Sequence, residues 1–248
     1  MGGDHIICMK WIDFPIFSST NFPSEFKVNE TPAGILLINK PLGWTSFDVV
    51  KYVRSRIQRK KVGHAGTLDP MADGLLVLCF GVATKSIDQI QSQTKEYLAK
   101  IKFGGSTPSY DAETQVDQQA EYEHITLEDI KKKLLSDFSG EIQQIPPMYS
   151  ALKRNGKKLY ELARKGESVV LEPRPVHVYS TDIQSFTGNT LRLTINCSKG
   201  TYIRSIAHDL GIALGSRAHL CGLTRSKIGG LDAKQAIEIS VFESLVKQ

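Results

Sequence analysis

Apolar runs and alternating patterns along the chain predict several β-strands. GILLINKP at 34–41 is a short apolar run ended by proline, and LLVLCFG at 75–81 is apolar throughout, so both are expected to be buried strands. In KEYLAKIKF at 95–103, every second residue from Tyr97 to Phe103 is apolar, which indicates a strand with one buried face. Further strands are expected in PVHVYSTDIQSF and TLRLTINCS, joined by the turn TGN, and in AHLCGLTRSKI.

The segment SFDVVKYVRSRIQ, after the first strand, has the spacing of an amphipathic helix. Phe47, Val50, Val53 and Ile57 fall on one stripe, and Ser46 stands where an N-cap is expected. The other face carries lysine and arginine side chains. We therefore expect a helix with one buried face and one basic face.

Four more segments have the features of helices. TLEDIKKKLLSDF at 126–138 begins with the T-x-x-D spacing of a capping box, and Thr201 is the expected cap of TYIRSIAHDLGIAL. GKKLYELARKG reads as a short basic helix that ends at glycine, and DAKQAIEISVFESLVKQ as a terminal helix. Because strands, helices and hairpin turns are interspersed, the pattern predicts an α+β fold with a mixed or mostly antiparallel sheet flanked by helices.

Charge along the chain is segregated. The chain has 248 residues, 41% of them hydrophobic, and a net charge of +5, which permits a polyanionic partner without requiring one. Residues 40–64 carry seven lysines and arginines against one acid, and residues 151–177 carry seven against three. Residues 110–129 carry seven acids and no lysine or arginine. This pattern indicates one face that attracts phosphates, although solvated surface charge explains the runs equally well.

The four cysteines form no C-x-x-C pair, and Cys79 and Cys197 fall in apolar strand-like runs, so they are expected to be core residues. That usage argues against a disulfide framework or zinc site and favours a reducing compartment. The sequence contains no apolar stretch of membrane-spanning length and no signal-peptide pattern at its start. We expect a cytoplasmic protein that does not associate with membranes.

The stretch KVGHAGTLDP at 61–70 concentrates candidate chemistry in a glycine-rich loop ahead of a buried strand. The sequence lacks a P-loop, a G-x-G-x-x-G fingerprint, a G-x-S-x-G elbow and a cluster of metal-ligand residues. What remains is a solitary Asp69. From the pattern alone it is either a catalytic carboxylate held by the sheet or a turn-forming aspartate ahead of proline.

Several separate blocks carry a resemblance to one family. GHAGTLDPMADGLL, preceded by INKPLGWTSFDVV and followed by VLCFGVATK, resembles the TruB family of tRNA pseudouridine synthases. The similarity continues through KEYLAKIKFG, QQIPPMYSALKRNGKKLYELARKG, CSKGTYIRSIAHDLG and HLCGLTRSKIGG, and covers roughly residues 33 to 235. It implies the pseudouridine synthase fold, with a catalytic cleft across the sheet.

The resemblance also implies a reaction. The family isomerises uridine to pseudouridine at position 55, in the T-loop of tRNA, without metal or organic cofactor. Asp69 is then the catalytic carboxylate, because breaking the C1′–N1 glycosidic bond builds positive charge at C1′ that an anion can stabilise or trap covalently. Whether the carboxylate adds to the sugar or assists elimination to a glycal stays open.

The remaining site residues come from the same resemblance. Arg204 is the arginine that pairs with the catalytic carboxylate and keeps it ionised, with a surface helix residue as the alternative. Tyr97 is the active-site tyrosine whose ring stacks on the base and whose hydroxyl lies where the C5 proton is removed, with an ordinary strand aromatic as the alternative. His64 inserts where the flipped nucleotide leaves its loop. Tyr202 and Leu223 wall the uracil pocket, with core packing as the alternative. Lys153 and its basic neighbours would hold phosphates of the T-stem and loop.

The chain departs from many family members at its ends. We expect residues 1–30 to be an N-terminal extension of unknown role and residues 31–248 to be the catalytic domain, a short form lacking the C-terminal PUA domain. A monomer is expected, with no protein partner required. Two other functions stay open: a tRNA-binding helper, or RNA chaperone, that uses the same cleft, and the catalytic subunit of a guide-RNA pseudouridylation complex.

Overall fold

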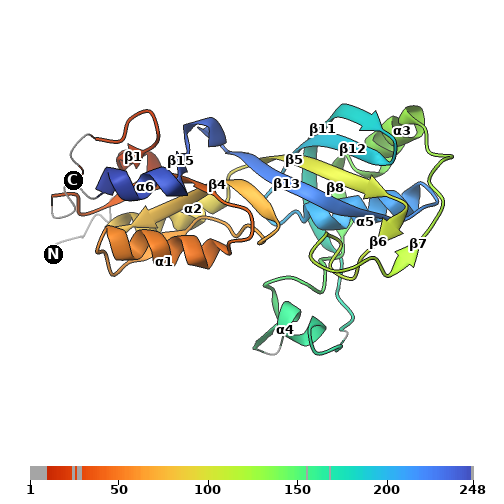
Figure 1. Ribbon diagram of the computed structural model, residues 1–248, viewed down its shortest axis with the longest axis horizontal. Helices are drawn as coiled ribbons and strands as arrows, with labels where there is room; N and C mark the ends of the chain where they lie inside the picture. Colours follow the sequence, from red (N-terminus) through yellow and green to blue (C-terminus); the bar gives the residue numbers. More distant parts are fainter. Residues whose placement is uncertain (1–9, 24–25, 27–29, 155, 168, 247–248) are drawn as a thin grey trace, which may run out of the picture. The chain divides into compact units, whose positions relative to one another are not determined.

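A computed structural model describes residues 10–23, 26, 30–154, 156–167 and 169–246. The chain divides into two compact units (Figure 1). Unit 1 comprises residues 1–93 and 225–248, and unit 2 comprises residues 94–224. Unit 1 is therefore built from both ends of the polypeptide, whereas unit 2 is one continuous segment.

The sheet of unit 1 is mixed. Its strands are β1 (Ile16–Phe17), β2 (Gly34–Lys40), β3 (Val62–His64), β4 (Ala72–Phe80), β14 (Leu231–Asp232) and β15 (Ile237–Glu238). Strand β2 is antiparallel to β4, which also pairs with β3, while the short strands β1 and β15 both run parallel to β2. The buried runs predicted around residues 34–41 and 75–81 are thus confirmed as β2 and β4.

Both faces of the unit 1 sheet are covered. The helical segments are η1 (Trp11–Asp13), α1 (Ser46–Arg56), η2 (Gly81–Ser86), α2 (Ile87–Gln91), η3 (Ala233–Gln235) and α6 (Ile239–Val246). Alternate residues of β2 and β4 point to opposite faces: Leu36 and Leu78 pack with α1 and α6, while Leu37 and Val77 pack with α2. Burial on both sides explains why these strands are continuous apolar runs rather than alternating ones.

Helix α1 differs from its prediction at two residues. Its N-cap is Thr45 and not Ser46. The Thr45 hydroxyl accepts a hydrogen bond from the backbone N–H of Asp48. Ser46 is buried and bonds to Leu68 instead. Phe47 was expected on the buried stripe but is 55% exposed, because Val49 occupies the apolar face in its place.

The amino-terminal extension contributes to the core of unit 1. Strand β1 lies along β2, with Ile16 paired to Ile35. Phe17 and Phe26 are buried, and their rings meet edge-on with centroids 5.2 Å apart. The described part of the extension thus completes a sheet edge and an aromatic cluster, while residues 1–9 lie outside the described part.

The sheet of unit 2 has the strand order β13-β5-β12-β11-β8. The strands are β5 (Lys95–Phe103), β8 (Gly140–Gln144), β11 (Arg174–Thr187), β12 (Thr190–Cys197) and β13 (Ala218–Ile228), of which the last enters unit 1 at Arg225. The pairs β5·β12, β12·β11 and β11·β8 are antiparallel. Two small hairpins join β6 (Gly105–Ser106) to β7 (Gln118–Gln119) and β9 (Lys153–Arg154) to β10 (Lys157–Lys158).

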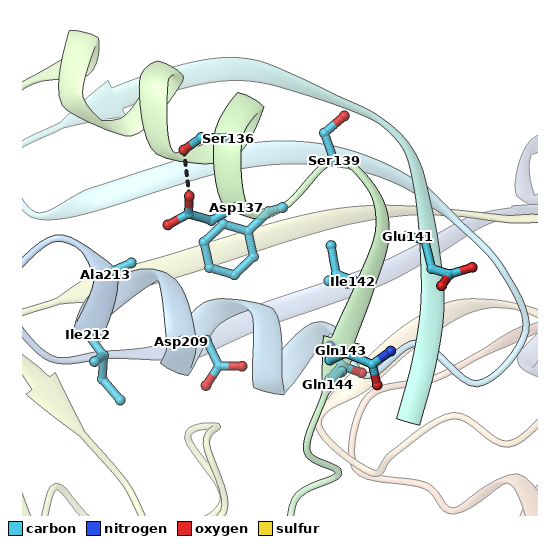
Figure 2. A pocket seen from close by; sticks show the side chains of 11 residues that line it. Ser136, Asp137, Ser139, Glu141, Ile142, Gln143, Gln144, Asp209, Ile212 and Ala213 are labelled. Atoms are coloured by element: carbon cyan, nitrogen blue, oxygen red, sulfur yellow. Dashed lines mark hydrogen bonds between the residues drawn. The ribbon is translucent and has the colours of Figure 1, made fainter. Parts of the chain in front are cut away.

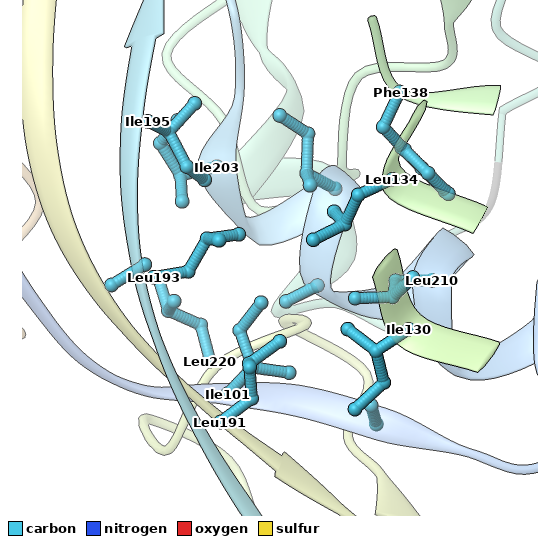
Figure 3. Close-up of a cluster of buried hydrophobic side chains, with 14 of the residues drawn as sticks. Ile101, Ile130, Leu134, Phe138, Leu191, Leu193, Ile195, Ile203, Leu210 and Leu220 are labelled. Atoms are coloured by element: carbon cyan, nitrogen blue, oxygen red, sulfur yellow. The ribbon is translucent and has the colours of Figure 1, made fainter. Parts of the chain in front are cut away.

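One face of the unit 2 sheet carries its core. The helices of this unit are α3 (Leu127–Asp137), α4 (Leu159–Ala163) and α5 (Ile203–Ala213). Ile130 and Leu134 of α3 and Leu210 of α5 pack against Ile101 and Leu193 of the strands (Figure 3). The inward residues of β5 alternate with exposed ones, as the sequence pattern predicted.

The predicted α+β class with a mixed, mostly antiparallel sheet is confirmed, and the capping box of α3 at Thr126 is present. Besides that of α1, three helix predictions were wrong in part. The basic segment 156–166 forms a hairpin strand and only the short α4. Helix α5 has Tyr202, not Thr201, at its N-cap, and the terminal segment splits into η3, β15 and α6. None of the described helices has the length and apolar character needed to span a membrane.

Candidate active site

The loop that carries Asp69 connects β3 to β4 in unit 1 and is fixed by its backbone. The carbonyl of Asp69 accepts the N–H of Ala72 at 3.0 Å, and the carbonyl of Pro70 accepts the N–H of Gly43 at 2.8 Å. The Asp69 side chain is half-buried. A carboxylate in this position is held by the sheet edge and still reachable by a ligand.

Two buried side chains from distant segments also bind this loop. The Ser46 hydroxyl accepts the N–H of Leu68 at 2.8 Å and donates to its carbonyl at 3.1 Å. Arg225, only 1% exposed, donates from Nη2 to the carbonyl of Gly66 at 3.1 Å and from Nη1 to that of Thr67 at 3.3 Å. The three residues before Asp69 are therefore all bound through their main chain.

Lys40, at the end of β2, places a buried ammonium near the same loop. Its Nζ donates to the carbonyls of Pro41 at 2.9 Å and Trp44 at 2.7 Å. Burial lowers the pKa of Lys40 to about 8. The attraction of Asp73, and then of Asp69, acts in the opposite direction because it favours the charged ammonium.

His64 ends β3, opposite Leu78 of β4. Burial, and then repulsion from Arg225, hold the pKa of His64 below its ordinary value, although the Gly66 backbone acts in the other direction. The ring is therefore neutral at neutral pH. A neutral, partly buried imidazole is suited to stacking, as expected for a residue beside an extruded nucleotide.

Arg204, in the first turn of α5 in unit 2, is buried at 3% exposure. This burial rules out the alternative that it is a surface helix residue. Its Nη1 donates to the carbonyl of Ser109 at 3.2 Å and lies 3.6 Å from Oδ2 of Asp111. These two contacts orient the guanidinium inside the unit.

Asp111 is a candidate functional residue that the sequence analysis missed. Its Oδ1 accepts the Ser109 hydroxyl at 2.6 Å and the N–H of Glu113 at 3.0 Å, and the carboxylate itself is buried. These bonds fix its position beside Arg204. Asp111 lies in the acidic run 110–129, which solvated surface charge explains equally well. The S-x-D spacing to Ser109 is the only local signal of a turn closed by a side-chain hydrogen bond.

The remaining pocket candidates lie in unit 2. Tyr97 on β5 and Leu223 on β13 are partly buried, and both pack against the unit 2 core. Tyr202 precedes α5, and its backbone N–H and carbonyl bond to the buried Gln144 amide at 2.7 and 3.0 Å. Gln144 is a second supporting residue that sequence reasoning did not find.

Lys153 lies on the exposed hairpin β9–β10, paired with Lys158. The Tyr160 ring lies near the Lys158 ammonium, 5.3 Å from its centroid, and near the Arg164 guanidinium at 5.5 Å. Cations beside an aromatic ring are typical of a surface that binds nucleic acid.

The structure thus gathers the candidates into two sets. His64 and Asp69 belong to unit 1, and Tyr97, Tyr202, Arg204, Leu223 and Lys153 belong to unit 2. In unit 1, buried side chains bind the backbone just before Asp69, and in unit 2 hydrogen bonds hold the Arg204 guanidinium and the Tyr202 backbone. The pairing of Asp69 with Arg204, which would join the two sets, stays a prediction.

A polar pocket of about 450 Å³ in unit 2 is not the candidate site (Figure 2). It is lined by residues of α3, β8 and α5, among them the acids Asp137, Glu141 and Asp209. Burial raises the pKa of Asp209 to about 6. An acidic lining disfavours phosphate, and none of the seven candidates lines this pocket.

The described part of the chain contains no group of side chains suited to binding a metal ion. There, no three histidine, cysteine, aspartate or glutamate side chains gather closely enough to hold a metal ion. Cys79 and Cys197 are buried, as expected of core residues, and burial raises the pKa of Cys79 to about 12. Their thiols are therefore unreactive at neutral pH.

Two solved structures share this fold. The chain superposes on a chain of a Cbf5-Nop10-Gar1 complex with a TM-score of 0.67 and 25% identity, covering 96% of this chain and 61% of that one. An archaeal box H/ACA sRNP Nop10-Cbf5 complex gives 0.63 and 22%, covering 90% of this chain and 57% of that one. The chain thus spans about three fifths of those longer chains.

Curated relatives match over most of the chain. A protein named tRNA pseudouridine synthase B from Parabacteroides distasonis is 46% identical over 220 residues, covering 86% of this chain and 93% of that protein. Its namesake from Flavobacterium johnsoniae is 45% identical, covering 84% and 94%. The one from Dechloromonas aromatica is 47% identical, covering 86% of this chain but 70% of that longer protein.

The fold and these matches define the class as the pseudouridine synthases, which are isomerases. The model of the TruB family pseudouridylate synthase N-terminal domain matches residues 54–203, more than half of the chain. The chain belongs to the TruB family.

Proposed function

We propose that the protein isomerises uridine to pseudouridine at position 55 in the T-loop of tRNA. The curated relatives carry a tRNA pseudouridine synthase name at up to 47% identity, which supports tRNA as the substrate. The expected monomeric state, the absence of a cofactor or protein partner, and the cytoplasmic location remain predictions.

The proposed reaction assigns a task to each candidate. Asp69, ionised, stabilises or captures the sugar C1′ as the C1′–N1 bond breaks and its electron pair stays on N1. The base then turns and C5 bonds to C1′, which frees the carboxylate if it was bound. The C5 proton leaves to water and N1 takes up a proton. Tyr97 stacks on the base, Tyr202 and Leu223 wall it, and His64 fills the space that it vacates. Arg204 pairs with Asp69 and maintains its charge.

One observation carries the proposal: Asp69 is a half-buried carboxylate that follows three residues bound by buried side chains, and its own carbonyl accepts the N–H of Ala72. An anion so fixed needs no reorganisation when positive charge develops at a sugar carbon. Supporting this, Arg204 is a buried, oriented cation.

Surface cations supply a docking surface for the RNA. In the basic run of α1, Lys51 and Arg54 are exposed, whereas Arg56 binds Glu243 at 3.2 Å and Arg59 donates to the carbonyl of Thr31. The exposed members, together with Lys153 on its hairpin, suit the phosphates of the T-stem. Such contacts position the RNA without reading its sequence.

Substitution of the catalytic carboxylate tests the proposal directly. A tRNA transcript tritiated at C5 of uridine releases its label to water when C5 bonds to C1′. Asp69→Asn removes the anion but keeps the shape, so we expect tRNA binding to persist and tritium release to fall at least about a thousandfold. Filter binding and label release measure the two effects.

The matched control is Asp88→Asn, which changes an exposed aspartate of α2 and should leave release unchanged. Release by Asp69→Asn at the wild-type rate would contradict the assignment of the carboxylate. A wild-type protein that binds tRNA but never releases label would instead establish the RNA-chaperone function.

A further inference from the structure

We propose that Ser46 and Arg225 are positioning residues of the active site, acting through the loop that carries Asp69. This inference rests on the proposed function. Both side chains come from segments far from the loop in sequence, one from the start of α1 and one from β13. Neither was a candidate in the sequence analysis.

The geometry places their bonds on consecutive residues. Four hydrogen bonds reach Gly66, Thr67 and Leu68, all from these two side chains and all at 2.8–3.3 Å. The next residue is Asp69. Because a peptide chain has only two soft dihedral angles per residue, fixing three successive residues restricts where the fourth can point its side chain.

Arg225 also joins the loop to the sheet. Its Nε donates to the carbonyl of Leu75 on β4 at 2.8 Å, while both terminal nitrogens bind the loop. One rigid, planar guanidinium thus sets the loop's distance from the strand. A lysine at this position would offer one point charge instead of a fork with fixed angles.

Burial excludes a direct role in RNA binding for this pair. Arg225 is 1% exposed and Ser46 is 2% exposed, so neither can reach a phosphate. Their effect must pass through the loop backbone to the carboxylate. Their loss should therefore lower the rate of the chemical step while leaving the affinity for tRNA nearly intact.

The test compares single-turnover tritium release, tRNA affinity and thermal unfolding for Arg225→Gln, Arg225→Lys and Ser46→Ala. We expect the release rate at saturating tRNA to fall about a hundredfold for Arg225→Gln and about tenfold for the other two, because small misplacements of a catalytic group have costs of this size. The dissociation constant should stay within about threefold. The double variant Ser46→Ala/Arg225→Lys should lose less than the product of the single losses, because both act on one loop.

Two control substitutions remove comparable bonds elsewhere. Ser18→Ala deletes a buried hydroxyl that donates to Asn21 at 2.6 Å, and Arg217→Gln deletes a guanidinium that donates to the carbonyl of Ser216 at 3.0 Å. These should lower the unfolding temperature but keep the release rate within about twofold, as expected for bonds that only stabilise the fold.

Release rates within threefold of wild type in folded Ser46→Ala and Arg225→Lys would overturn the inference, whether or not Arg225→Gln folds. A loss of tRNA affinity that matched the loss of rate would overturn it as well. Full activity in Asp69→Asn would instead refute the proposed function, so the two failures are distinguishable.

Discussion

Buried ionisable residues make stability depend on pH one side chain at a time. Asp209 on α5 is partly enclosed, and burial raises its pKa to about 6 from an ordinary value near 4. Its ionised form is therefore less favourable in the folded protein than in the unfolded chain. This cost is absent while the carboxyl is protonated in both states, appears as pH rises from about 4 to 6, and persists above that.

Asp209→Asn should therefore stabilise the protein at neutral pH. An amide keeps the shape and removes the charge, so we expect a gain of about 1–2 kcal/mol in unfolding free energy at pH 7, discounted for partial exposure. The gain should vanish below about pH 4. Urea unfolding of both proteins at pH 4 and 7 measures it, and an equal difference at the two pH values would contradict the cause given.

The contacts of some individual residues could not be predicted from the sequence. Thr45 and Ser46 both carry a hydroxyl suited to an N-cap, and only the nearness of Leu68 decides which one caps α1. Asp111 sits in an acidic run, and its role emerges only from contact with Arg204, more than ninety residues away in sequence. Such partners depend on tertiary contacts that local patterns do not encode.

Among the elements, those with a strong burial pattern were the most predictable. β5 alternates because one face meets α3 and α5, and β2 is apolar from Gly34 to Ile38 because both of its faces are covered. The terminal segment is not the single helix predicted, because Ile237 pairs with Ile38 on β2 and the middle of the segment forms a strand. At these residues, tertiary strand pairing outweighs the local helix propensity.

The hairpin β9–β10 should carry part of the electrostatic affinity for tRNA. Replacing Lys153 and Lys157 with Gln removes two exposed charges, so the plot of log affinity against log salt should become shallower by about 1.4–1.8. The single-turnover rate at saturating tRNA should change little. Binding titrations between 50 and 200 mM salt, about the range where such contacts dominate, measure the slope.

An equal charge change elsewhere controls for the overall field. Lys131 and Lys132 are exposed on α3, and replacing both with Gln leaves the same net charge as the hairpin variant. If the α3 variant flattened the salt dependence as much as the hairpin variant, the affinity would come from net charge and not from a local contact.

At the scale of the whole molecule, chain connectivity separates the two units. Unit 2 is continuous from residue 94 to residue 224 and encloses its own core of strands, α3 and α5. Unit 1 needs both ends of the chain, because Phe242 of α6 is fully buried among residues of α1, β2 and β4. The units should therefore differ in their ability to fold alone.

A polypeptide of residues 94–224 should fold by itself, with a cooperative urea transition and a stability on the order of 5 kcal/mol. Residues 1–93 alone should not, because they lack Phe242 and the buried guanidinium of Arg225. Circular dichroism and urea titration of the two polypeptides test this. Failure of the first to unfold cooperatively would mean that its core is insufficient.

The outer side of β2 is shared by two short strands from opposite ends of the sequence. β1 pairs with residues 35 and 36, and β15 pairs with residues 38 and 39. An apolar strand with an open side invites association between molecules. Here β1 and β15 together occupy that side of β2. Tags or trimming at either terminus therefore act on the same protection against aggregation.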